Sequence, residues 1–417
     1  MNALTNKSHW RELAVHGGRA AFPEPLHVGR PNVGDRAALL RRIESALDRK
    51  WLTNNGPYVQ ELETRLAELC GVEHCVLVSN GTAALELAAA ALRISPRETG
   101  GRRASRRSEV LMPSLTFVAT AHAFRWRGCR PVFADVDPDT LTLDAAAALR
   151  RCTADTTAIC GVHLFGQICD VDGLQRLADE RGVPLIYDAS HALSNSLPGE
   201  LPGGERRVGQ FGTLEVFSLH ATKFIGCGEG GAIATRHGEL AERLRRLRNF
   251  GFSDQGRVEQ LGVNAKMSEL AAAMGLSMLE QRERFVDANR RNYEAYRDAL
   301  QGLPGIRLRP CHVPRQNCQY VVIHVDGRAA QLGRDELMRV LHAEGVLARP
   351  YFSPPCHRLP PYCVEDGSEH GDAALPVTER AAAELLALPT GESVTPEQIR
   401  LIGRLISLAQ SRWARAA

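Results

Sequence analysis

The sequence predicts an α/β protein with a three-layer, mostly parallel sheet, followed by a smaller α+β domain. Between residues 75 and 187, short apolar runs rich in β-branched residues alternate with amphipathic helical runs. Continuous apolar strands separated by helices are typical of a parallel sheet covered on both faces. Beyond residue 285 this alternation stops. We therefore expect an N-terminal arm at 1–34, a large domain at 35–285 and a small C-terminal domain at 286–417.

The individual elements follow from periodicity and from turn residues. Two amphipathic helices are expected first, at 35–50, where Asp35 begins the run, and at 59–69, after the Gly56-Pro57 turn. The expected strands are 75–78, 110–112, 131–134, 158–162 and 184–187, and the helices between them are 82–92, 117–126, 143–149 and 171–181. Helices at 240–250 and 267–285 follow. The small domain has expected strands at 320–323 and 346–348 and helices at 335–344 and 395–408.

Composition excludes several classes of protein. A formal charge of +3 over 417 residues argues against an extended nucleic-acid surface, and the arginine pairs at 102–103 and 106–107 are typical of a solvated loop. The first ten residues lack the apolar core of a secretory signal, and no apolar run approaches the ~18–20 residues of a membrane span. The eleven cysteines form no C-x-x-C pair, so we expect neither a disulfide framework nor a zinc or other metal site, and a reducing cytoplasm fits.

Parallel sheets bind ligands beyond the carboxyl ends of their strands, so the residues after each expected strand are candidates. The turn at 79–82 joins a strand to a helix and contains Gly81, which lets backbone N–H groups approach an anion. A phosphate site is one interpretation. The alternative is a simple helix N-cap by Thr82, which is at least as common.

Two further strand ends carry an acid and an amine. Asp188 follows an apolar strand directly, where it could keep a pyridinium-type nitrogen protonated or simply cap a helix. Lys223 lies between a β-like run and a glycine-rich loop, where desolvation would favour Schiff-base chemistry, although most lysines are solvated surface charges. Together with an aromatic ring at Phe117 and a hydroxyl at Ser218, these groups suit an aromatic aldehyde phosphate. Pyridoxal 5′-phosphate (PLP) has that structure.

The same stretches carry a family resemblance. From about residue 52 to 279 the chain resembles the DegT/DnrJ/EryC1/StrS group of PLP-dependent nucleotide-sugar aminotransferases, which have the fold-type I aspartate aminotransferase architecture. The matching stretches, in the family's order, are TNNGP at 53–57, NGTAAL at 80–85, PSLTFVAT at 113–120, VHLFG at 162–166, DASHA at 188–192, FSLHATKFIGCGEGG at 217–231 and NAKMSE at 264–269. A weaker match, YFSPPCH at 351–357, resembles the family's substrate-side segment.

The resemblance implies roles for individual residues around the cofactor ring. Lys223 would form a Schiff base with the aldehyde and move the proton in each half-reaction. Asp188 would pair with the ring nitrogen, His191 would lie near the ring hydroxyl, and Phe117 would stack on the ring. A lone histidine such as His191 is otherwise more often a structural residue.

The phosphate and substrate contacts are implied in the same way. Gly81, Thr82 and Ser218 would bind the phosphate, while Asn264 would reach the phosphate of the neighbouring subunit, because the family builds each site at a homodimer interface. The residues carried over as substrate neighbours are Thr53, His163, Tyr351 and His357.

Two departures from the family pattern bear on the substrate. Many members have glutamine at the position of His191, and many have Tyr-Pro at the position of His220-Ala221. The combination is similar to the branch that aminates dTDP-4-keto-6-deoxy sugars at the 4-keto group with L-glutamate as donor. A 3-keto nucleotide sugar, a ketocyclitol, or a PLP-binding regulatory protein without turnover are the alternatives. A related dehydratase branch has histidine in place of the lysine, so Lys223 argues against that chemistry.

Overall fold

The computed structural model describes residues 4–95, 108–199, 201, 204–311, 315–363 and 374–413, so the arginine pairs at 102–107 lie outside the described residues. The chain forms two compact units, each assembled from separate stretches. The sheet unit comprises Val33–Arg282 and Pro355–Thr378. The small unit comprises Met1–Asn32, Glu283–Pro354 and Glu379–Ala417.

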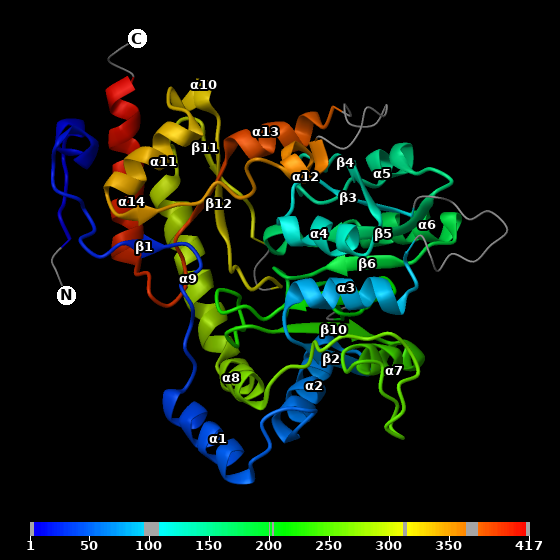
Figure 1. The fold of residues 1–417 in the computed structure, drawn as a ribbon. Coiled ribbons are helices and arrows are strands. Elements are labelled where there is room, and N and C mark those ends of the chain that lie inside the picture. The colour runs from blue at the N-terminus through cyan, green and yellow to red at the C-terminus, as the bar shows by residue number, and fades with distance from the viewer. Residues whose placement is uncertain are drawn as a thin grey trace. The chain divides into compact units, whose positions relative to one another are not determined.

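A seven-stranded mixed sheet forms the centre of the sheet unit, as the alternation of strands and helices predicts (Figure 1). Only the pairs made by β10 are antiparallel, and all other neighbours run parallel. The strands in spatial order are β2 (His74–Val78), β10 (Gly231–Thr235), β9 (Leu214–Ser218), β6 (Leu185–Asp188), β5 (Thr156–Val162), β3 (Glu109–Pro113) and β4 (Arg130–Ala134).

Helices cover both faces of this sheet and give the expected three layers. One face is covered by α3 (Gly81–Ala91), α4 (Val118–Trp126) and α7 (Gly238–Leu247), whose apolar side chains share one core with the strands. The other elements of the unit include α1 (Arg36–Arg49), α2 (Pro57–Cys70), α5 (Ala145–Arg151), α6 (Val171–Arg181), α8 (Glu269–Leu279), η3 (Leu164–Gly166), η4 (Cys356–Arg358), α12 (Pro360–Cys363) and the hairpin of β7 (Ser196–Pro198) and β8 (Glu205–Arg207). Because side chains alternate along a strand, Val76 and Val78 share the core with α3, while the buried Leu77 points to the opposite face of the sheet.

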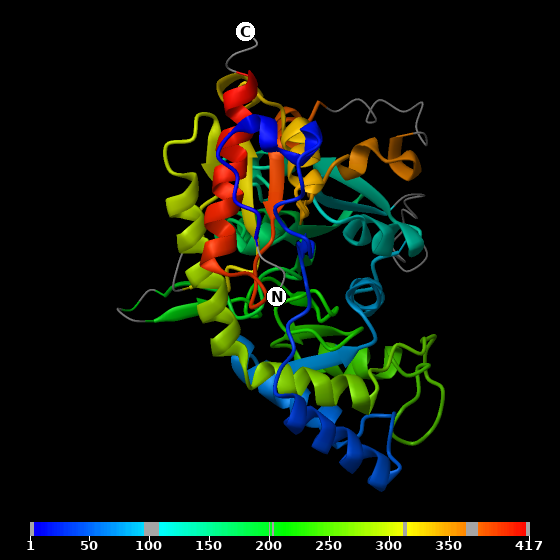
Figure 2. The same cartoon turned by 90° about the vertical axis from the view of Figure 1, so that its left-hand side faces the viewer.

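The small unit has its own sheet and core. Strands β11 (Ile306–Leu308), β12 (Val321–Val325) and β14 (Leu385–Leu388) pair antiparallel, and β1 (Leu26–His27) pairs parallel with β13 (Val346–Leu347). Its helical elements are η1 (Trp10–Glu12), η2 (Ala14–His16), α9 (Arg282–Leu300), α10 (Gly327–Ala330), α11 (Arg334–Ala343), α13 (Pro376–Glu384) and α14 (Pro396–Trp413), of which α9 and α13 begin in the sheet unit. Figure 2 shows the N-terminal arm (blue) beside α14 (red).

One disulfide corrects the prediction that the cysteines form no disulfide framework. Cys311 and Cys318 are bonded within the small unit, and the remaining cysteines are free and mostly buried. The pair was missed because its spacing has no C-x-x-C pattern. A spacing of seven residues does not by itself show that two cysteines meet. Within the described residues, no helix is long and apolar enough to cross a membrane, and no cluster of His, Cys, Asp and Glu could hold a metal.

A buried ion pair fixes the N-terminal arm inside the small unit. Lys7 is 2% exposed, and its Nζ donates to Glu344 Oε1 at 2.8 Å and to the backbone carbonyls of Glu12 and Arg19. Glu344 also accepts the backbone N–H groups of Ala14 and Ala21. The arm, which sequence patterns leave without an assigned element, is therefore held by charge and by backbone hydrogen bonds.

We predict that Lys7→Met destabilises the small unit by about 3–5 kcal/mol, because Glu344 would stay buried without its partner. The measurement is urea unfolding followed by circular dichroism. Arg284→Gln is the matched control, since it breaks the exposed pair Arg284–Glu392 of the same unit and should cost at most about 1 kcal/mol. Equal midpoints for the two variants would contradict the role given to Lys7.

Candidate active site

The parallel strands bring the candidate residues of the sheet unit to one edge. The carboxyl ends of β2, β3, β5, β6 and β9 lie at that edge, because these strands share one direction. Asp188 is the last residue of β6, and the segments that follow the other four strands contain Gly81, Phe117, His163 and Lys223.

Gly81 and Ser218 form a narrow cradle at the N-terminus of α3. A Cβ atom on Gly81 would lie 3.1 Å from Ser218 Cβ, so a larger residue would crowd the two segments. The helix is capped by Asn80, whose side chain accepts the N–H of Ala83 at 2.8 Å. The alternative of a Thr82 N-cap is therefore wrong, and Thr82 lies in the first turn. Backbone N–H groups and the positive end of the helix dipole make this cradle suitable for a phosphate.

Lys223 lies on a tight loop between β9 and β10. Its backbone N–H donates to the carbonyl of His220 at 2.8 Å. The backbone N–H of Ala221 donates to the carbonyl of Gly228 at 2.8 Å, and Gly228 itself has a φ of +83°. The Lys223 side chain is half-buried. The chain has only four lysines, at 7, 50, 223 and 266, and Lys223 is the one placed among the parallel strand ends.

Asp188 ends β6 and is held from two sides. Its Oδ2 accepts the hydroxyl of Thr120 at 2.7 Å, and its Oδ1 accepts the N–H of Ser190 at 3.1 Å. The residue is 7% exposed. Each oxygen of a carboxylate has two lone pairs, so this arrangement leaves acceptor capacity for a ring N–H.

His191 is buried three residues after Asp188, and its surroundings favour the neutral imidazole. Burial, and secondly the positive charge of Lys223, lower the pKa of His191 well below its ordinary value. Its Nδ1 accepts the N–H of Phe165 at 3.1 Å, and the two rings stack. A neutral ring that accepts at Nδ1 carries its proton on Nε2, so His191 offers an N–H donor.

Phe117 and Asn264 are exposed, and each is next in sequence to a residue whose backbone is hydrogen-bonded. Phe117 is 57% exposed and precedes α4. Asn264 precedes Ala265, whose carbonyl accepts the N–H of Ser79 at 2.8 Å next to the phosphate cradle. The stretch that carries Asn264 is thus attached to the strand end of β2.

The four predicted substrate neighbours lie in different environments. His357 is bound to the turn after β3, where its Nδ1 is 2.7 Å from Ser114 Oγ. Thr53 is exposed on the loop before α2. Tyr351 belongs to the small unit, where its ring contacts Phe352 and Tyr320.

His163 is fully buried. Its ring stacks on Tyr187 with centroids 4.6 Å apart, its Nδ1 accepts the N–H of Cys169, and its Nε2 lies 3.3 Å from Glu215 Oε2. These contacts are structural, and a role at the substrate stays a prediction.

Two buried charged side chains hold the loop that contains Thr53. The sequence patterns did not single them out. Arg248 donates to Asn55 Oδ1 at 3.0 Å and also binds Glu63 and the carbonyl of Leu77. Glu269 accepts the N–H groups of Tyr58 and Val59 and so caps α2. Glu269 belongs to the stretch at 264–269, but sequence alone did not say what the carboxylate binds.

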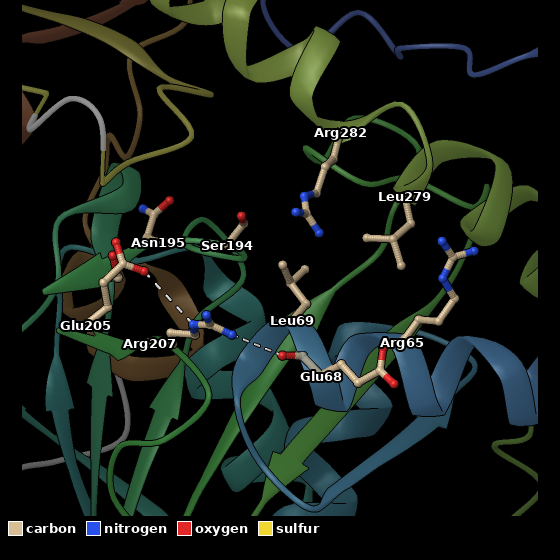
Figure 3. Close-up of a pocket in the computed structure, with 10 residues that line it drawn as sticks. Arg65, Glu68, Leu69, Ser194, Asn195, Glu205, Arg207, Leu279 and Arg282 are labelled. Carbon is tan, nitrogen blue, oxygen red and sulfur yellow. Dashed lines mark hydrogen bonds and ion pairs between the residues drawn. The ribbon is translucent and has the colours of Figure 1, made fainter. Parts of the chain in front are cut away.

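A polar cavity of about 410 Å³ lies where α2 and α8 end beside the β7–β8 hairpin (Figure 3). Arg65, Arg207 and Arg282 line it. Arg65 pairs with Glu61 and Glu280, and Arg207 contacts Glu205 and the carbonyl of Glu68. Because acidic groups of the chain itself compensate the charges of Arg65 and Arg207, we assign no ligand to this cavity.

Comparisons with known proteins show the family of this chain. The sequence profile of the DegT/DnrJ/EryC1/StrS aminotransferase family matches residues 35–407. The dTDP-4-amino-4,6-dideoxy-D-glucose transaminase of Escherichia coli is 33% identical over 382 residues, which cover 91% of this chain and 98% of the relative. The GDP-perosamine synthase of Caulobacter vibrioides is 33% identical over 368 residues, covering 87% of this chain and 93% of the relative.

A solved structure matches over nearly the whole length. The crystal structure of DesI in the presence of its TDP-sugar product is 46% identical, has a TM-score of 0.87 and covers 97% of each chain. The chain therefore belongs to the DegT/DnrJ/EryC1/StrS aminotransferase family, and it is a PLP-dependent aminotransferase of nucleotide sugars.

Proposed function

We propose that this protein transfers the amino group of L-glutamate to the 4-position of a dTDP-4-keto-6-deoxyhexose. The observation that carries the proposal is the likeness to DesI, which extends over 97% of both chains and whose structure was determined with a TDP-sugar product. The relative from Escherichia coli, named for a dTDP-4-amino sugar, supports the same position and nucleotide. The match with a GDP-perosamine synthase makes a GDP sugar the second candidate.

The residues present fit PLP. The cradle of Gly81, Thr82 and Ser218 would bind its phosphate, where a Cβ on Gly81 would crowd Ser218. The buried carboxylate of Asp188 would hold the ring nitrogen, and the exposed face of Phe117 would stack on the ring. When bound, PLP stabilises the negative charge left on carbon when an amino compound loses a proton.

The chain's own groups would divide the proton chemistry between them. Lys223 would hold the aldehyde and then carry the proton between carbon atoms, which suits a half-buried amine on a short, fixed loop. His191 would donate from Nε2 to the ring hydroxyl while staying neutral, since its pKa is lowered. Asp188 would keep a positive charge on the ring nitrogen.

A homodimer is part of the proposal. Large apolar side chains are exposed along the stretch that contains Asn264: Phe250, Phe252, Val258, Leu261, Val263 and Leu270. Leu261 is 88% exposed, which is costly for a leucine in water. A second copy that covers this stretch would bury these side chains and would place Asn264 next to the phosphate of the partner's cofactor.

We predict that Lys223→Arg removes the yellow absorbance of lysine-bound cofactor and lowers turnover by about a thousandfold or more, because arginine keeps the charge but loses the reactive amine. Lys50→Arg and Lys266→Arg are matched controls that should retain both properties. Absorbance spectra and 2-oxoglutarate release measure the two effects. A Lys223→Arg variant with wild-type turnover would refute the role of this amine.

A substrate panel tests the sugar. The wild-type protein is incubated with L-glutamate and, separately, a dTDP-4-keto-6-deoxyhexose, its GDP counterpart, a 3-keto dTDP sugar and a ketocyclitol. Mass spectrometry should show amine product mainly with the dTDP 4-keto sugar. A faster reaction with any other substrate would overturn the assignment, and no release of 2-oxoglutarate from glutamate would favour a binding protein without turnover.

The dimer is tested by charge insertion. Leu261→Glu should weaken the dimer by about tenfold or more, because it buries an unpaired charge in the interface. Leu201→Glu is the control, since Leu201 is also exposed, at 77%, but lies on the β7–β8 hairpin. Sedimentation velocity measures both. A monomeric wild type would contradict the proposal, as would equal dissociation of the two variants.

A further inference from the structure

Three buried side chains form a continuous hydrogen-bonded line that ends on Asp188. Thr116 Oγ1 lies 2.8 Å from Thr120 Oγ1, which lies 2.7 Å from Asp188 Oδ2. Thr120 is completely buried, and Thr116 is 2% exposed. Thr116 belongs to the turn after β3 and Thr120 to the first turn of α4, so the line crosses from β3 to β6 over the intervening strand β5.

Elementary hydrogen-bond chemistry fixes the direction of this line. An ionised carboxylate only accepts, so Thr120 must donate its single hydroxyl proton to Asp188. Thr120 can then only accept from Thr116, and Thr116 must donate. A donor whose own oxygen accepts a hydrogen bond is polarised and becomes a stronger donor, so the two hydroxyls act together on the carboxylate.

The hydroxyl of Thr120 is not needed to complete its own helix. A threonine inside a helix commonly donates to the carbonyl of the preceding turn, whereas Thr120 donates across the fold to a strand end. A buried valine would fill nearly the same volume without a hydroxyl. The use of a threonine here is therefore explained by the carboxylate that it meets.

We propose that Thr120, supported by Thr116, is a positioning residue that fixes the plane of the Asp188 carboxylate. With Thr120 on Oδ2 and the Ser190 N–H on Oδ1, the carboxylate cannot rotate freely. A carboxylate held in one plane keeps its free lone pairs directed toward the ring nitrogen that it would face. The inference rests on the proposed role of Asp188 and adds the groups that tune it.

The test compares holoenzymes carrying PLP labelled with ¹⁵N at the ring nitrogen. Thr120→Val removes the donor, Thr120→Ser keeps it, and Thr116→Val removes only its support. Thr235→Val is the matched control, because Thr235 is equally buried but donates to a backbone carbonyl. Asp188→Asn defines the signal of a ring nitrogen that has lost its ionised partner.

In Thr120→Val we expect the ¹⁵N signal to move toward that of Asp188→Asn and the rate of cofactor loss in dialysis to rise by about tenfold, as the loss of one hydrogen bond to a charged group implies. Thr116→Val should shift the signal less, in the same direction. Thr120→Ser and Thr235→Val should match the wild type.

Two outcomes would overturn the inference in distinguishable ways. If Thr120→Val and Thr116→Val both match Thr235→Val while Asp188→Asn shifts the signal, the threonines do not tune the acid, although the proposed function stands. If Asp188→Asn itself leaves the ¹⁵N signal unchanged, Asp188 does not hold the ring nitrogen, and the proposed cofactor geometry fails together with the inference.

Discussion

Parallel strands cannot be joined by a tight turn, and this constraint organises the sheet unit. Each connection between neighbouring parallel strands must cross back over a face of the sheet, so all strands except the antiparallel β10 end at the same edge. Gly81, Phe117, Asp188 and Lys223 lie far apart in the sequence, yet each follows a strand that ends there. The helices supply the core, and the edge is left for polar groups.

Charged side chains have different hydrogen-bond partners at this edge and in the layers behind it. Behind the edge, Arg248 and Glu269 are buried, are bound by several hydrogen bonds and hold the loop before α2. At the edge, Asp188 keeps acceptor capacity and His191 is held neutral by burial and by the charge of Lys223. The hydrogen-bonded charges hold the frame, and the spare acceptor capacity of Asp188 is available to a ligand.

Sequence patterns predicted the sheet, its covering helices and the strand-end residues, because hydrophobic period and turn chemistry are local. They could not show the Cys311–Cys318 bond, because the spacing of two cysteines seven residues apart does not say whether they meet. They could not show the return of residues 355–378 to the sheet unit either, because it depends on contacts between distant segments. The choice of Asn80 over Thr82 as helix cap depends on the residue at which the backbone changes from extended to helical. Thr120 was visible inside a family stretch, but only the fold brings its hydroxyl to Asp188.

The central claim is that one amine among four lysines holds the cofactor, and peptide mapping after borohydride reduction of the purified protein tests it most directly. The rival is Lys266, because burial and the charge of Arg248 lower its pKa. Reduction should leave a pyridoxyl group on the peptide that contains Lys223 and on no other. A pyridoxyl group on Lys266, or none on Lys223, would contradict the account.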